Sequence, residues 1–117
     1  MTDVRRLVAI LPCNDLDASQ AFYERLGFVH RDHADDYRLM ADGQGAELHL
    51  TKAVEGWLVP GRNPFGLYLY AEDVDELAAR VGKRPEETLW GMYEFGLSDP
   101  DETNVRIGWP IRLRNAP

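Results

Sequence analysis

A pattern of apolar run, acidic triplet, helix and glycine occurs twice in this chain, and no other feature limits the possible folds as strongly. The triplets are Asp15-Leu16-Asp17 and Asp73-Val74-Asp75, whose first residues are separated by about half of the 117-residue chain. Each triplet follows a run of the kind that forms a strand and precedes apolar residues at helical spacing. Repetition of one supersecondary unit at half the chain length indicates an internal duplication.

The first copy predicts a βαβββ module over about residues 5–55. Its helix is expected over about 16–26, because Asp15 can cap it and Gly27 can end it. The first strand is expected to end at Pro12, which lacks a backbone N–H donor. The expected strands are residues 7–11, 28–29, 37–40 and 46–51.

The second copy predicts the same module over about residues 64–110, after a connection rich in glycine and proline. Asp73 is expected to start its helix and, with Glu76, resembles a capping box in which Asp replaces Ser or Thr. Gly82 is expected to end that helix. The expected strands are residues 66–71, 93–97 and 104–107, with a further short strand before Trp90.

The composition is that of an ordinary globular protein and gives no support to nucleic-acid binding. Hydrophobic residues make up 44% and charged residues 28%, and 20 acidic against 13 basic side chains leave a formal charge of −7. That sign repels a phosphate backbone and suits a cationic ligand. Carboxylates that are scattered over solvated faces and serve solubility would account for the charge equally well.

Cysteine usage and hydropathy indicate the compartment. Cys13 is the only cysteine, so an intramolecular disulfide, which is typical of small secreted scaffolds, cannot form. The opening residues, Met1-Thr2-Asp3-Val4, begin no signal-type segment, and no apolar run has the length of a membrane span. We therefore expect a cytoplasmic protein with a single domain over residues 1–117 and no membrane partner.

Two pairs of motifs give the chain a resemblance to a known superfamily. The first pair is Leu-Pro-Cys-Asn-Asp-Leu at 11–16 and Ala-Phe-Tyr-Glu-Arg-Leu-Gly-Phe at 21–28; the second is Trp-Gly-Met-Tyr-Glu-Phe at 90–95 and Asp-Pro-Asp at 99–101. Together they resemble the vicinal-oxygen-chelate superfamily, which contains glyoxalase I, extradiol dioxygenases, fosfomycin-resistance enzymes and bleomycin-resistance proteins. The resemblance implies an α+β fold in which two βαβββ modules form a strongly curved mixed sheet.

The chain departs from the superfamily pattern at Glu102, where such sequences often have Gly after Asp-Pro-Asp. A non-glycine residue there implies an ordinary right-handed or bridge conformation, or a tolerated local strain. The departure therefore affects the geometry of one turn and leaves the expected fold unchanged.

The resemblance also implies where an enzyme of this superfamily would hold a divalent metal. The corresponding positions are Leu7, Glu47, Gly66 and Arg106. Only Glu47 can ligate a metal, because leucine and glycine have no donor side chain and arginine is permanently cationic. One carboxylate, even with His49 added, falls short of the three or four protein donors of a zinc site. We therefore expect no bound metal and no cofactor.

Two further groups that could carry chemistry are interpreted as structural. The polar stretch 30–36 contains two histidines and three aspartates, but a solvated turn is favoured over a metal cluster because no donors share a face at regular spacing. Cys13 has no general base beside it in the sequence, so a half-buried structural thiol is favoured over a nucleophile.

The bleomycin-resistance type within this superfamily implies a dimer whose clefts are lined by aromatic side chains. The matching positions here are Tyr37, His49, Thr51, Tyr68, Tyr70 and Trp90, with Met92 as a looser match. Flat rings stack on heteroaromatic groups and attract cations. The alternative for each residue is packing in the core or a dimer interface. Trp90 is the strongest candidate because of its motif, whereas Trp57 and Trp109 are expected to pack or to lie at the solvent edge.

The leading functional hypothesis is a metal-independent protein that sequesters a cationic antibiotic, such as a glycopeptide, in the cleft of a homodimer. On this interpretation the protein binds its ligand and is not an enzyme. The first alternative is a metal-dependent enzyme of the glyoxalase or dioxygenase type. The second is a metal-free relative that binds another metabolite.

Overall fold

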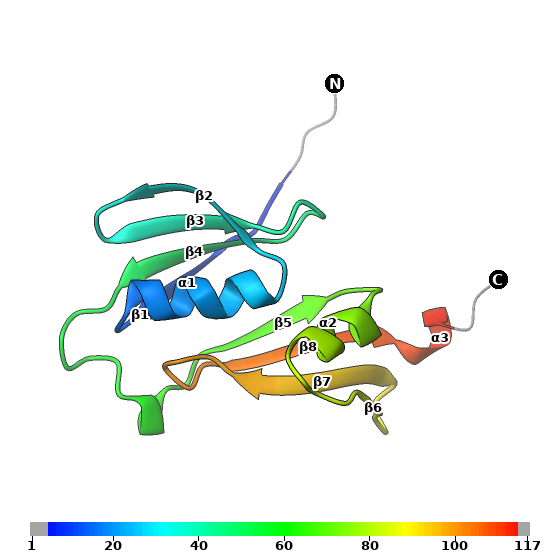
Figure 1. The fold of residues 1–117 in the computed structure, drawn as a ribbon. Coiled ribbons are helices and arrows are strands. Elements are labelled where there is room, and N and C mark those ends of the chain that lie inside the picture. The colour runs from blue at the N-terminus through cyan, green and yellow to red at the C-terminus, as the bar shows by residue number, and fades with distance from the viewer. Residues whose placement is uncertain (1–4, 115–117) are drawn as a thin grey trace.

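The computed structural model describes residues 5–114, apart from the side chain of His33. Residues 1–4 and 115–117 lie outside this description. They are the two ends of the expected domain, and residues 1–4 are also the opening residues that were considered for a signal segment. The described chain forms two four-stranded mixed sheets, one from each half, with a helix in each half (Figure 1). This arrangement confirms the predicted α+β fold with two βαβββ modules.

The first half forms a sheet with the strand order β1-β4-β3-β2. Strands β1 and β4 are parallel, and the other neighbours are antiparallel. Its elements are β1 (Ala9–Cys13), α1 (Leu16–Arg25), β2 (Val29–Ala34), β3 (Tyr37–Ala41) and β4 (Glu47–Lys52).

The second half repeats this topology in a sheet with the order β5-β8-β7-β6. Strands β5 and β8 are parallel, as β1 and β4 are, which confirms the duplication inferred from the sequence. The short turn η1 (Pro60–Arg62) lies in the connection, and the C-terminal helix α3 was not predicted. The other elements are β5 (Gly66–Tyr70), α2 (Val74–Arg80), β6 (Glu86–Glu87), β7 (Met92–Ser98), β8 (Asn104–Pro110) and α3 (Ile111–Arg114).

The two long helices begin differently, although both follow an aspartate. The Asp15 side chain accepts a hydrogen bond from the Ala18 N–H at 3.1 Å, which confirms it as the cap of α1. Asp73 makes no side-chain capping bond, so the predicted capping box is wrong. Its backbone, at φ −88° and ψ 45°, departs from the extended conformation in which a cap side chain reaches the first turn. Gly27 and Gly82 end the helices at φ 98° and 68°, as predicted.

The two edge strands of the first sheet differ from their predicted bounds: β1 is shifted from 7–11 to Ala9–Cys13 with no change in length, and β2 runs over Val29–Ala34 in place of 28–29. Strand β1 continues through Pro12, opposite Thr51, because an edge strand needs no N–H donor on its outer side. Strand β2 extends to Ala34, so the predicted solvated turn at 30–36 is wrong except at Asp35 and Asp36. A polar sequence suits an edge strand, where charged side chains discourage pairing with another chain.

The turn after β7 shows which backbone conformation Glu102 adopts at the position where related sequences often have Gly. This residue has φ 63°, a left-handed conformation that glycine adopts more easily, so the tolerated strain expected as one alternative is the one present. Its N–H donates to the Asp99 carbonyl at 2.9 Å, which holds the turn closed. The ordinary right-handed or bridge conformation, the other alternative, does not occur.

One apolar core joins the two halves. Leu16, Tyr23 and Leu26 of the first half and Phe95 and Ile107 of the second belong to the same buried cluster. A buried hydrogen bond also joins the halves, because the Tyr23 hydroxyl donates to Asp99 Oδ2 at 2.8 Å. Helix α1 therefore packs against the first sheet while its tyrosine is anchored to the second half.

Tyr23→Phe is expected to destabilise the fold by about 1.5–3 kcal/mol, because a buried carboxylate oxygen would lose its donor. Tyr23 is 1% exposed and Asp99 is 4% exposed, so water cannot replace the hydroxyl. Urea denaturation measures the change. Tyr93→Phe is the control, since its hydroxyl bonds Asp75 at the surface and should change stability by less than about 0.5 kcal/mol. Equal losses in both variants would contradict the assignment.

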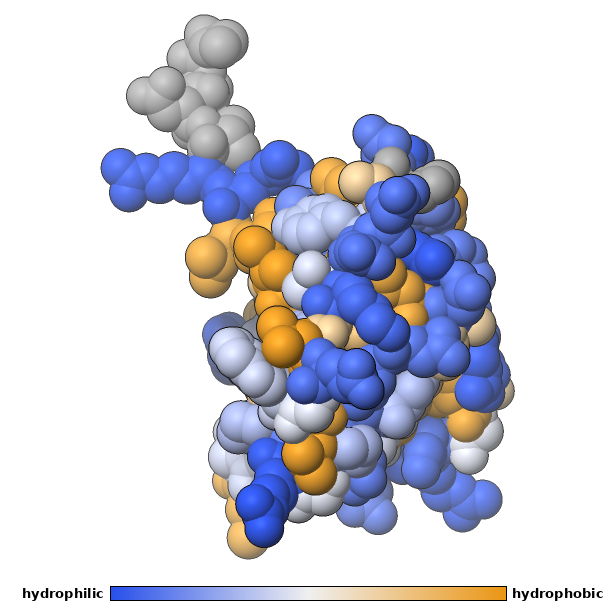
Figure 2. Space-filling model, turned by 90° about the vertical axis from the view of Figure 1, so that its left-hand side faces the viewer, coloured by the Kyte–Doolittle hydropathy of each residue, from blue (hydrophilic) through white to orange (hydrophobic). Residues whose placement is uncertain are grey.

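Figure 2 shows one side of the molecule, on which hydrophilic residues predominate and hydrophobic residues appear between them in small groups. None of the helices in residues 5–114 is long and apolar enough to cross a membrane.

Candidate ligand-binding site

The six predicted ligand residues form two groups on the sheet faces that point away from the core. Along β4, Leu48 and Leu50 are buried while His49 and Thr51 are partly exposed, as expected from strand alternation. Tyr37 lies opposite Thr51 and completes the first group. The second group is Tyr68 and Tyr70 on β5 with Trp90 just before β7. We call these groups the first and second aromatic faces.

The first aromatic face is held together by one side-chain hydrogen bond. Tyr37 Oη and His49 Nδ1 are 2.7 Å apart, and the two rings pack edge to face with their centroids separated by 5.3 Å. Thr51 Oγ1 donates to the Asp36 carbonyl at 3.4 Å. The structure therefore brings the three predicted residues together as a half-buried surface with both polar and aromatic groups.

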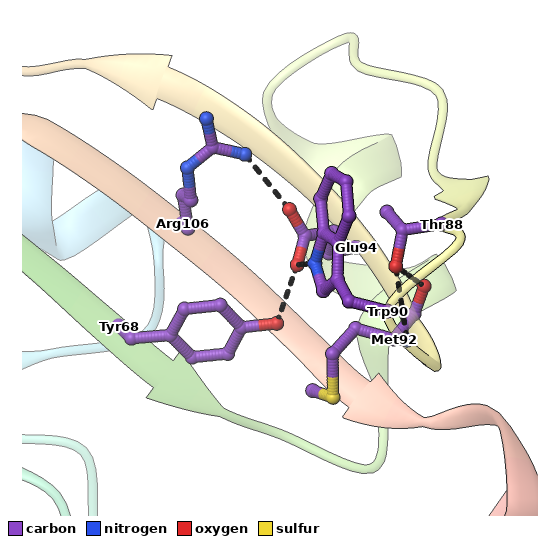
Figure 3. A network of polar contacts seen from close by, with 6 residues as sticks. All are labelled: Tyr68, Thr88, Trp90, Met92, Glu94 and Arg106. Carbon is purple, nitrogen blue, oxygen red and sulfur yellow. Dashed lines mark hydrogen bonds and ion pairs between the residues drawn. The ribbon is translucent and has the colours of Figure 1, made fainter.

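The second aromatic face is built around a carboxylate (Figure 3). The Tyr68 hydroxyl donates to Glu94 Oε1 at 2.8 Å, and Trp90 Nε1 donates to the same oxygen at 3.4 Å. Arg106 Nη1 binds the other oxygen, Oε2, at 2.8 Å. Tyr70 packs against Tyr68 with ring centroids 4.9 Å apart. The rings therefore form a row from Tyr70 through Tyr68 to Trp90.

Glu94 is the residue that sequence reasoning missed. It is 5% exposed, and a buried carboxylate needs partners for both oxygens, which Tyr68, Trp90 and Arg106 supply. Alternation along β7 could have found it, because Phe95 belongs to the core and its neighbour Glu94 must therefore lie on the face of Tyr68. Partial burial and the bond to Glu94 raise the pKa of Tyr68 above its usual value, so the phenol stays protonated and remains a donor.

Gly108 makes room for this network. It lies opposite Glu94 in the β7–β8 pair and next to Tyr70 in the β5–β8 pair. A Cβ atom at this position would collide with the Tyr68 hydroxyl and would lie 2.8 Å from Glu94 Cβ. The absence of a side chain at this position is therefore a condition for the Tyr68–Glu94 bond.

A tight turn positions Trp90. The Thr88 Oγ1 donates to the Met92 carbonyl at 2.9 Å, and the Met92 N–H donates back to Thr88 Oγ1 at 3.0 Å. Gly91 has φ 91°, which glycine tolerates. The turn leaves Trp90 69% exposed beside Met92, the looser candidate (Figure 3). Trp57 is 81% exposed and Trp109 packs against the core, in agreement with the solvent-edge and packing roles expected for them.

A hollow of about 880 Å³ adjoins the second aromatic face at Tyr70. Its walls include three carboxylates, Asp42, Glu72 and Asp73, and one cation, Arg80. Arg80 is paired with Glu76 at 3.1 Å, so the hollow has an excess of negative charge. We call it the acidic hollow.

The positions that correspond to the superfamily's metal ligands do not fit a metal centre. Leu7 is fully exposed, Gly66 has no side chain, and Arg106 is bonded to Glu94. Glu47, the one residue with a donor carboxylate, is paired with Arg6. Within residues 5–114, side chain of His33 aside, no three His, Cys, Asp or Glu residues cluster in a way that could hold a metal ion.

Cys13 fits a structural role. It is fully buried rather than half-buried, and its thiol lies 3.4 Å from the Leu11 carbonyl. Burial raises the pKa of the Cys13 thiol to about 11, which keeps it protonated and unreactive at neutral pH.

Comparison with known proteins identifies the class to which this structure belongs. No protein-family model and no curated protein sequence matches the chain. A bleomycin-binding protein complexed with bleomycin matches at 27% identity and a TM-score of 0.80, over 91% of this chain and 98% of that one. A bleomycin resistance determinant encoded on the transposon Tn5 matches at 26% identity and a TM-score of 0.80, over 92% and 98%.

An enzyme also shares the fold. A lactoylglutathione lyase from Agrobacterium tumefaciens matches at 22% identity and a TM-score of 0.70, over 93% of this chain and 96% of that one. The matches therefore define a protein of the glyoxalase/bleomycin-resistance fold class. Within that class, the chain is a bleomycin-resistance-protein-like member of the vicinal-oxygen-chelate superfamily, as its motifs predicted.

Proposed function

We propose that this protein is a metal-independent binding protein that sequesters a cationic antibiotic or a related ligand. The observation that carries the proposal is the second aromatic face, where Glu94 holds Tyr68 and Trp90 in place while both rings keep an exposed surface. Rings that are already oriented lose little conformational freedom when a ligand stacks on them. The likeness to a bleomycin-binding protein and to a bleomycin resistance determinant supports the same function.

A cationic ligand suits the surroundings of this face. The acidic hollow, with Asp42, Glu72 and Asp73 in its walls, lies at the Tyr70 end of the ring row. Each cation–π contact contributes roughly 0.5–2 kcal/mol, and nearby carboxylates add attraction at low salt. The formal charge of −7 on the whole chain also favours a cationic ligand.

A homodimer would complete the site. Each aromatic face belongs to a different sheet and is open on one side, whereas small-molecule sites bury 70–90% of the ligand surface as a rule. In an isologous dimer the first aromatic face of one copy can lie across from the second face of the other, which makes two equivalent clefts. We also place the protein in the cytoplasm, where a single buried thiol such as Cys13 remains reduced.

Isothermal calorimetry with bleomycin is the test of this function. The expected result is one bleomycin per chain, with affinity that falls as salt increases, and no heat from zinc, nickel or manganese. A neutral metabolite that binds while bleomycin does not would favour the metal-free alternative with another ligand. Stoichiometric metal that survives dialysis and is needed for an activity would overturn the proposal in favour of an enzyme.

Sedimentation is expected to show a dimer at micromolar concentration. The physical reason is that a monomer leaves both aromatic faces, including the 63% exposed Tyr70, in contact with water. Velocity runs with and without bleomycin measure the state directly. A species that remains monomeric in both conditions would contradict the two-copy cleft while leaving the fold assignment intact.

A further inference from the structure

A second hollow adjoins the Trp90 end of the ring row and differs in charge from the acidic hollow. Its volume is about 300 Å³, and its charged walls are Lys83, Arg84, Glu86, Glu94 and Arg106. We call it the basic hollow. Three of the chain's 13 basic residues line this hollow, although the formal charge of the chain is −7.

Some charged side chains of the basic hollow have hydrogen-bond or ion-pair partners within the protein, and others have none in the described part of the chain. Glu94 and Arg106 neutralise each other, and both Glu94 oxygens already have partners. The side chains of Lys83 and Arg84 make no hydrogen bond or ion pair to any residue in the described part of the chain, and Glu86 is the remaining carboxylate of the hollow. Arg106 uses Nη1 for Glu94, and its side chain is 48% exposed. A positive excess with unused N–H donors therefore remains.

Trp90 supplies a flat surface beside these donors. Its indole nitrogen is directed to Glu94, which fixes the orientation of the ring (Figure 3). Thr88, whose hydroxyl closes the turn that carries Trp90, also lines the hollow. A planar group that stacked on Trp90 would thus place a neighbouring substituent near the cations.

We propose that the basic hollow binds an oxyanion, a carboxylate or a phosphate, carried by a ligand whose planar part stacks on Trp90. Lys and Arg bind such groups through charge-assisted hydrogen bonds, with the guanidinium offering two parallel donors. The inference rests on the proposed function and narrows its ligand class. The row from Tyr70 to Trp90 joins the acidic hollow to the basic hollow, so the ligand carries a cation at one end and an anion at the other.

The test uses 1-naphthyl phosphate as a planar oxyanion and 1-naphthol as its neutral counterpart. Binding is followed by the indole N–H resonance of Trp90 in two-dimensional NMR, assigned by its loss in Trp90→Phe. The wild-type protein should bind the phosphate about tenfold more tightly than the naphthol, as expected for one or two charge-assisted contacts. Equal affinity for the two probes, or no shift with either up to millimolar concentration, would overturn the proposal.

Charge variants make the test specific to this hollow. The double variant Lys83→Gln/Arg84→Gln should weaken phosphate binding about tenfold and leave naphthol binding unchanged, whereas Glu86→Gln should strengthen phosphate binding. Arg62→Gln is the matched control, because Arg62 is an exposed cation on η1 that does not line the hollow. Equal weakening by Arg62→Gln would show general charge attraction and would overturn the site.

The calorimetry with bleomycin separates this inference from the function on which it rests. If the protein binds bleomycin but binds 1-naphthyl phosphate no more tightly than 1-naphthol, the oxyanion site is rejected and the proposed function is retained. The reverse result is that the protein does not bind bleomycin but binds the phosphate probe, and that Lys83→Gln/Arg84→Gln weakens this phosphate binding. That result would support the oxyanion site and reject sequestration of a bleomycin-like ligand.

Discussion

Trp90→Ala is expected to weaken bleomycin binding roughly thirtyfold while the melting temperature stays nearly unchanged. Truncation of an aromatic anchor removes about 2 kcal/mol or more of binding free energy, which corresponds to that factor. Stability should change little, because Trp90 is 69% exposed and its bond to Glu94 is long, at 3.4 Å. The experiment therefore needs calorimetry and thermal unfolding on the same preparation.

Trp57→Ala is the matched control for Trp90→Ala. Trp57 is an exposed tryptophan that belongs to neither aromatic face, so its loss should leave the bleomycin affinity unchanged. An unchanged dissociation constant for folded Trp90→Ala would remove Trp90 from the site. A large fall in melting temperature with unchanged affinity would instead show that Trp90 is a packing residue.

Gly108→Ala is expected to destabilise the protein by about 1–3 kcal/mol, the usual range for overpacking a filled site. The added methyl group would meet the Tyr68 hydroxyl, Glu94 Cβ at 2.8 Å and the Tyr93 carbonyl at 3.0 Å. Tyr68 can swing away, but the strand that carries Glu94 cannot move without disturbing the β7–β8 pair. Urea denaturation measures the loss, and bleomycin affinity should fall as well because Tyr68 leaves its position.

Gly96→Ala provides the control for the glycine substitution. Gly96 lies in β7, and its nearest neighbours would be the Val105 carbonyl at 3.8 Å and Arg106 Cγ at 3.9 Å, which are ordinary contact distances. Neither glycine has a positive φ, so the two substitutions differ mainly in the space available. Comparable stability losses at both positions would show that the loss comes from replacing a glycine in a strand. They would contradict the interpretation that Gly108 is needed to leave room for Tyr68.

The modules could be predicted from sequence because their signals are local. Asp15 and Gly27 delimit α1 through contacts within a few residues, and alternation in β4 assigns its two faces. The edges were less predictable, since the tolerance of β1 for Pro12 depends on which neighbour lies beside it in the sheet. Asp73 failed as a capping side chain for a similar reason, because its backbone conformation is not determined by the residue type.

The candidate site could be predicted only in part. Each aromatic residue was identified from its motif or position, but the division into two faces depends on strand order. The network around Glu94 joins Tyr68, Trp90 and Arg106 from three segments, and strand register brings them together. Arg106 illustrates the difficulty, because its residue type excluded a metal without indicating that it balances a buried carboxylate.

The duplicated topology has a consequence for how this protein could evolve. The hydrogen bond between Tyr37 and His49 lies entirely within the first sheet, and the Glu94 network lies entirely within the second half. A substitution on one aromatic face therefore leaves the bonds of the other intact. Ligand preference can change one half at a time, and a new specificity needs no simultaneous change in both copies of the module.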